Sequence, residues 1–84
     1  MSMVRLVGFD HCVAGISYSA GEPDRLCYDT AKIYKHLMDQ DQMTFSEAVE
    51  FFEYNILGSY MGETSPSFLT FADMQEILEV HCFD

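Results

Sequence analysis

Short apolar segments separated by turn residues open the chain and predict β-strands. Residues 4–9 and 12–18 are rich in β-branched and aromatic side chains, and residues 25–28 form a third such segment. The sequence Ser-Ala-Gly-Glu-Pro-Asp at positions 19–24 is the clearest turn signal in the chain. Because that turn joins the second segment to the third, we expect those two to pair as an antiparallel hairpin.

After the hairpin the apolar spacing changes to three and four residues, which predicts a helix. Asp29 or Thr30 can cap its first turn, and the pattern ends near residues 39–40. The apolar side of this helix contains Ile33, Tyr34, Leu37 and Met38. The other side should face outward, and it contains Lys32, Lys35 and His36.

A capping box marks the start of the second predicted helix. In Thr44-Phe45-Ser46-Glu47, the Thr44 hydroxyl can accept the backbone N–H of Glu47 while the Glu47 carboxylate accepts that of Thr44. The helix should run to about Leu57, where Gly58 ends it. Its core side consists of Ala48, Val49, Phe51, Phe52 and Ile56. Its outer side consists of Glu47, Glu50, Glu53, Tyr54 and Leu57.

The C-terminal segment predicts a short strand and a last helix. Pro66 opens residues 67–69, which can add an edge strand to the sheet. Thr70-Phe71-Ala72-Asp73 resembles a second capping box, so a helix should follow to about His81. That helix would bury Met74, Ile77 and Leu78 and expose Asp73, Glu76 and Glu79. The elements together predict one α+β domain over residues 1–84, with an antiparallel sheet of three or four strands and two or three helices packed on one face.

Charge restricts what such a domain can bind. Fourteen acidic residues stand against four Lys and Arg residues, giving a net charge of −10. All four bases lie in residues 1–42, whereas residues 43–84 contain eight acids and no Lys or Arg. This charge repels nucleic acid and anionic membranes, so we expect direct binding to neither. A basic protein, including one that itself holds DNA or RNA, is the partner that such a chain suits.

The acidic face of the second helix is the strongest candidate for a binding site. At 100° per residue its three glutamates span an arc of about 120°, and Tyr54 and Leu57 fall inside it. A charged rim around apolar side chains is typical of a protein-binding patch. A solvated helix face has the same pattern, but it would usually pair some acids with bases four residues away. The candidate partner-binding residues are Glu47, Glu50, Glu53, Tyr54, Leu57, Asp73, Glu76 and Glu79.

Histidine and cysteine positions offer weak candidates for chemistry. The adjacent pairs His11-Cys12 and His81-Cys82 suggest zinc, but the chain has no Cys-x-x-Cys or His-x-x-x-His spacing. In a strand, His11 and Cys12 would point to opposite faces. Asp10-His11 beside a cysteine could act as a base and nucleophile, yet no glycine-rich elbow or oxyanion loop accompanies it. We expect no catalytic residues, no metal and no cofactor.

Several motifs of this chain are similar to those of small uncharacterised proteins encoded by bacteriophages and prophages. The matching positions are Tyr28-Asp29, Met43-Thr44, Glu47-Ala48, Asn55, Gly58, Gly62-Glu63 and Pro66. Gly8-Phe9-Asp10-His11 and Val13-Ala14-Gly15 resemble the N-terminal strand pair of that family. The resemblance covers roughly residues 6 to 70, and the chain departs from the family at Gln42 and Ser65. Residues 71–84 are an addition to the family pattern.

The resemblance implies an infected bacterial cytosol, where small phage proteins commonly bind and disable host proteins. We therefore expect a cytoplasmic inhibitor of a host defence protein, with anti-CRISPR proteins as the nearest functional class and nucleic-acid mimicry as its means. A phage structural or regulatory homo-oligomer, such as a homodimer, is an alternative that needs no nucleic-acid-binding target. A small enzyme or metal-binding protein is a third. The first predicts salt-sensitive binding to a basic host protein, the second self-association alone, and the third turnover or bound metal.

Overall fold

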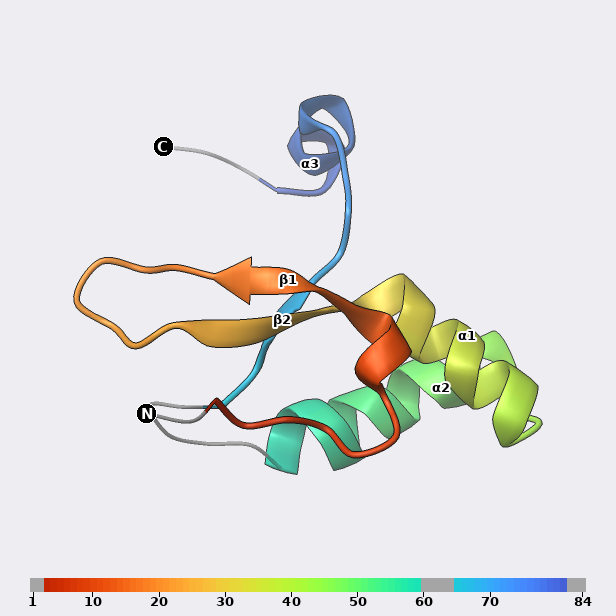
Figure 1. Ribbon diagram of the computed structural model, residues 1–84. Helices are drawn as coiled ribbons and strands as arrows, with labels where there is room; N and C mark the ends of the chain where they lie inside the picture. The colour runs from red at the N-terminus through yellow and green to blue at the C-terminus, as the bar shows by residue number, and fades with distance from the viewer. Residues whose placement is uncertain (1–2, 60–64, 82–84) are drawn as a thin grey trace.

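The computed structural model describes residues 3–59 and 65–81 and shows a three-stranded sheet with three helices (Figure 1). The strands are β1 (Val13–Ser17), β2 (Arg25–Asp29) and β3 (Ser67–Leu69), in the spatial order β1-β2-β3. The helices are α1 (Thr30–Gln40), α2 (Phe45–Phe51) and α3 (Met74–Val80). The predicted α+β class and the predicted edge position of β3 are confirmed.

The predicted hairpin is present, but the segment before it is not a strand. β1 and β2 pair antiparallel, with Ile16 opposite Leu26. Residues 4–9 were expected as a further strand and instead form an irregular segment ending in a turn. Both edges of β2 are already occupied by β1 and β3, and Gly8 has φ 89°, a left-handed conformation that ends an extended segment. The segment still contributes Leu6 to the core.

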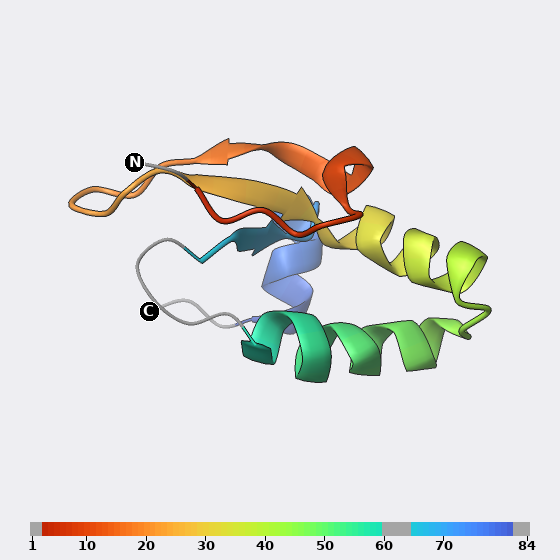
Figure 2. The same cartoon turned by 60° about the horizontal axis from the view of Figure 1, so that its bottom comes forward.

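β3 pairs with β2 in parallel, with Tyr28 opposite Phe68, so the expectation of a fully antiparallel sheet is wrong for this pair. The reason is the path between the two strands. α1 continues outward from the end of β2, and α2 returns beneath the sheet toward the end where β2 begins (Figure 2). The chain therefore enters β3 in the same direction as β2, as a crossover connection of this length allows.

The core lies between one face of the sheet and the helices α1 and α2. Its fully buried side chains include Tyr28 from β2 and Ile33 and Leu37 from α1. Phe52 packs edge-on against Phe68, with ring centroids 5.0 Å apart, which joins the segment after α2 to β3. The buried cluster consists of Leu6, Cys12, Tyr28, Ile33, Leu37, Ala48, Phe52 and Ile56.

α3 begins three residues later than the sequence predicted. Asp73 is its N-cap, and the Asp73 carboxylate accepts the backbone N–H of Glu76 at 2.9 Å. The Thr70 hydroxyl, expected to cap this helix, instead shares a 2.6 Å hydrogen bond with the hydroxyl of Thr30. Thr70 therefore joins the end of β3 to the start of α1, and the capping-box expectation at Thr70 is wrong.

α3 does not pack on the sheet. Figure 1 shows it apart from the sheet, on the side away from α2. Met74 and Leu78, which were expected to be buried, are 58% and 51% exposed, and Ile77 is half-buried. The helical run that begins with α2 therefore lies beneath the sheet, α1 extends beyond the end of β2, and α3 leaves Met74 and Leu78 largely in solvent, so the expectation that all the helices pack on one face holds only in part (Figure 2).

Candidate partner-binding surfaces

The start of α2 has the hydrogen bonds that its sequence predicts. The backbone N–H of Glu47 donates to the Thr44 hydroxyl at 3.2 Å, and the backbone N–H of Thr44 donates to the Glu47 carboxylate at 2.8 Å. The hydrogen bond from the Thr44 backbone lowers the pKa of Glu47, and the bond to the Thr44 side chain acts in the same direction. Glu47 is therefore charged and held at the first turn of the helix.

After Phe51 the helix widens into a π-helical turn, Phe52–Ile56, which the sequence did not predict. The backbone N–H of Leu57 donates to the carbonyls of both Glu53 and Phe52. A 3₁₀ turn, Leu57–Ser59, then ends the helical run. A Cβ added at Gly58 would lie 3.1 Å from the Glu53 carbonyl oxygen, so the missing side chain lets the chain close tightly over the wide turn.

The outer side of this helix forms the surface that the sequence predicted. We call Glu47, Glu50, Glu53, Tyr54 and Leu57 the α2 acidic surface. Its three glutamates are exposed, Tyr54 is 78% exposed and Leu57 is 48% exposed. Beside it lies a shallow hollow of about 310 Å³, lined in part by Met43 and Phe51, two half-buried residues that the sequence analysis had not assigned to a site.

Within residues 3–59 and 65–81, the salt bridges are Arg5 with Asp10, Arg25 with Glu22 and Lys35 with Asp39. Each of these pairs lies in the N-terminal half of the chain. The glutamates of the α2 acidic surface are in none of them. Glu47 is held by the backbone N–H of Thr44, and the exposed charges of Glu50 and Glu53 are screened by solvent and salt.

The remaining candidate residues form a separate surface on α3. Asp73, Glu76 and Glu79 are exposed there, and the Asp73 carboxylate is engaged as the N-cap. Because α2 and α3 lie on opposite sides of the sheet in Figure 1, the two acidic groups do not form one continuous patch. A partner that contacts the α2 acidic surface would interact with α3 only through the long-range electrostatic field of the α3 carboxylates.

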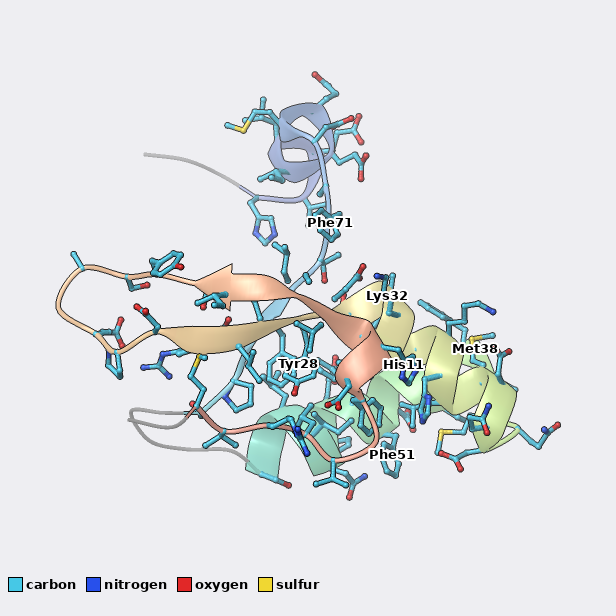
Figure 3. All side chains as sticks on the ribbon, viewed as in Figure 1. His11, Tyr28, Lys32, Met38, Phe51 and Phe71 are labelled. Atoms are coloured by element: carbon cyan, nitrogen blue, oxygen red, sulfur yellow. The ribbon has the colours of Figure 1, made fainter. Side chains whose placement is uncertain are left out.

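The outer side of α1 carries two of the four Lys and Arg residues of this protein, Lys32 and Lys35. Figure 3 shows His11 beside α1, on which Lys32 and Met38 are also labelled. His11 Nε2 and His36 Nδ1 share a 3.0 Å hydrogen bond, and both rings line a hollow of about 410 Å³ together with Lys32 and Lys35. The hydrogen bond to Asp39 raises the pKa of Lys35, so Lys35 stays charged. Asp39 lines the same hollow and pairs with Lys35, so the positive charge of this surface is partly offset.

Another hollow, of about 480 Å³, adjoins the one lined by His11 and His36 and shares Lys35 and Asp39 with it. We call it the α1–α2 groove. Its apolar wall comes from both helices, and the rings of Tyr34 and Phe45 meet edge-on there at 5.5 Å. Burial raises the pKa of Tyr34, and the charge of Glu53 adds to that effect. The residues of this wall are Ala31, Tyr34, Met38 and Phe45.

The structure does not bring the candidate catalytic or zinc-binding residues together. His11 is exposed and turned toward His36, whereas Cys12 is buried and its pKa is raised by that burial. Asp10 lies 3.6 Å from Arg5 instead of orienting His11. No cluster of three or more His, Cys, Asp or Glu side chains suited to a metal ion occurs in the described part of the chain, which excludes Cys82.

Among the helices that the structure describes, none combines the length and apolar character needed to cross a bilayer. Comparisons with models of known protein families, with curated proteins and with solved structures found no match. The surfaces of this chain are therefore the basis for its function, and the phage resemblance remains a prediction from the sequence.

Proposed function

We propose that this domain is a binding protein without catalytic activity and that its α2 acidic surface docks on a basic protein. The observation that carries the proposal is the make-up of that surface. An exposed tyrosine and an exposed leucine stand among three glutamates that form no salt bridge within the described residues. Apolar side chains that can be desolvated inside a charged rim are typical of protein interfaces.

The partner in this proposal is a nucleic-acid-binding protein of a bacterial host, with carboxylates taking the place of phosphates. The net charge of −10 and the absence of Lys and Arg after residue 42 support that choice. The resemblance to phage proteins supports an inhibitor of host defence, of the anti-CRISPR kind, that acts in the host cytosol. Asp73, Glu76 and Glu79 strengthen the field without touching the same site.

The test begins with a pull-down from a bacterial host and continues with binding kinetics against the purified partner at several ionic strengths. Glu50→Lys combined with Glu53→Lys should slow association and flatten its salt dependence. Glu76→Lys combined with Glu79→Lys is the matched control, since it changes the net charge equally from the other side of the sheet. If the α2 pair changes neither affinity nor salt dependence, the surface is only a solvated helix face.

Tyr54 supplies a second measurement on the same partner. Tyr54→Ala removes the largest exposed ring of the α2 acidic surface, so dissociation should become about tenfold faster while association changes little. Nucleic acid bound by the partner should compete with the wild-type domain. Simultaneous binding of both would contradict mimicry even if the affinity itself depends on Tyr54.

A further inference from the structure

α3 has an apolar stripe that the described residues leave largely uncovered. Met74, Ile77 and Leu78 follow the three- and four-residue spacing of one helix side, and two of them are more than half exposed. A helix of seven residues is marginal in water by itself, because its few hydrogen bonds do not offset the cost of nucleation. Packing of this stripe is the available source of stability, so α3 needs a surface to pack on.

The α1–α2 groove has the chemistry to receive it. Its wall is apolar, and Met38 and Phe45 within it are 38% and 58% exposed. A seven-residue helix is about 10 Å long, comparable with a hollow of about 480 Å³ that spans two turns of α1 from Ala31 to Met38. The hollow beside α2 also gathers Met43, Phe51 and Tyr54, but Glu47 and Glu50 line it too, which would repel the acidic α3.

Charge favours the same pairing. Asp73 and Glu79 flank the stripe of α3, and α3 contains no Lys or Arg. Lys35 lines the groove together with its ion-pair partner Asp39, and Lys32 lies beyond it on the same outer side of α1. The apolar side of α3 therefore matches the apolar wall of the groove, and its acids match the two lysines at the edge, where Asp39 offsets part of the positive charge.

We propose that two copies of this chain exchange their α3 helices, each seating the stripe Met74-Ile77-Leu78 in the α1–α2 groove of the other. Thr70 lines that groove and also begins the linker to α3, so the groove and the base of the helix are adjacent. The linker leads α3 away from α1 and α2, the helices that form the groove (Figure 1). A two-fold axis then makes two identical contacts at once, as in a domain-swapped dimer.

The expected strength follows from the size of the contact. Specific interfaces bury about 1,200–2,000 Å² in total, and two short helices seated in two shallow grooves come near the lower limit. The dimer should therefore be of moderate affinity and should weaken with salt. This inference goes beyond the proposed function, because the α2 acidic surface contributes nothing to the exchange and stays accessible in the dimer.

The experiment is sedimentation equilibrium of the full chain over a range of concentrations. The wild type should be a monomer–dimer mixture. Leu78→Asp on α3 and Met38→Asp in the groove should each raise the dimer dissociation constant at least tenfold. Both residues are exposed in the monomer, so circular dichroism should show that each variant remains folded. A wild type that stays monomeric at the highest soluble concentration overturns the proposal.

Mixing the two variants separates exchange from other modes of pairing. The Leu78→Asp chain keeps an intact groove and the Met38→Asp chain keeps an intact α3, so together they can form one of the two contacts. A heterodimer should appear that neither variant forms with itself. Dimerisation that is lost in Leu78→Asp but unaffected by Met38→Asp would mean that α3 pairs with α3, which overturns the exchange.

A charge swap tests the orientation. Lys35→Glu should weaken the dimer, and adding Glu79→Lys to the same chain should restore it. Tyr54→Ala should leave the dimer unchanged, while Leu78→Asp should still bind a partner of the α2 acidic surface. The two proposals can therefore fail independently. Failure of the charge swap to restore an assembly that Lys35→Glu weakens would contradict the seating of α3 beside Lys35.

Discussion

At the scale of single residues, Tyr28 joins parts of the fold that lie far apart in the sequence. Its side chain is fully buried, and its hydroxyl accepts the backbone N–H of Leu6 at 2.8 Å. That bond holds the irregular N-terminal segment against the sheet. The sequence indicated a strand residue at position 28, but no local signal relates it to a backbone group 22 residues earlier.

Tyr28→Phe should destabilise the protein without changing its fold. The ring remains, but the buried N–H of Leu6 loses its acceptor, which costs about 1–3 kcal/mol of unfolding free energy. The melting temperature of a domain this size should fall by about 4–8 °C for each kcal/mol. Tyr18→Phe is the control, because Tyr18 is exposed. Equal effects of the two substitutions would show that the bond to Leu6 contributes nothing.

At the scale of elements, the predictions from the sequence were right for features that depend only on neighbouring residues. Asp29 and Thr44 cap α1 and α2 as expected, because a cap needs only a side chain and the next three N–H groups. The predicted direction of β3, the predicted cap at Thr70 and the predicted burial of α3 were wrong. Each depends on parts of the chain that lie far away in sequence. The crossover path sets the direction of β3, Thr30 engages the Thr70 hydroxyl, and the described residues leave the apolar side of α3 largely uncovered.

The capping box predicts a pH dependence of stability. The folded state lowers the pKa of Glu47, so its carboxylate stabilises the fold above the unfolded-state pKa of about 4.3. That contribution is lost as the pH falls through the lowered pKa of the folded state. Glu47→Gln should therefore lose less stability than the wild type between pH 7 and pH 3 in chemical denaturation. Parallel profiles would contradict a role for the Glu47 charge.

The candidate α2 acidic surface was predictable for a related reason. A helical repeat places Glu47, Glu50 and Glu53 on the side opposite the buried Ala48 and Phe52, and the structure agrees. The hollows on α1 were not predictable. They depend on the approach of His11 to His36 and of Phe45 to Tyr34, contacts between separate elements that leave no repeat in the sequence.

At the scale of the whole molecule, the protein is less compact than a typical domain of its length. Its radius of gyration is 14.0 Å, against about 12 Å for a compact domain of 84 residues. The helices α1 and α2 pack into the core, whereas α3 stands apart from it (Figure 1). The free energy of unfolding of the core should therefore depend little on α3.

A chain that ends after Ala72 should keep the core intact. Within residues 3–59 and 65–81, no member of the buried cluster lies after Ile56, and Phe68, which packs against the cluster, precedes the cut. The melting temperature at low protein concentration, where the full chain is monomeric, should stay within a few degrees of the wild type. The truncated chain should no longer dimerise. A large loss of stability in the monomer would show that α3 packs on its own core.

The parallel pairing of β2 with β3 also sets an order of folding. The hairpin and α1 arise from residues close in sequence, whereas β3 must find β2 across about 40 residues, and closing such a loop has to precede the contacts that reward it. β3 should therefore dock late, when the ring of Phe68 enters between Tyr28 and Phe52. Until then one edge of β2 is open, and a newly made chain is most exposed to mispairing with another copy during that interval.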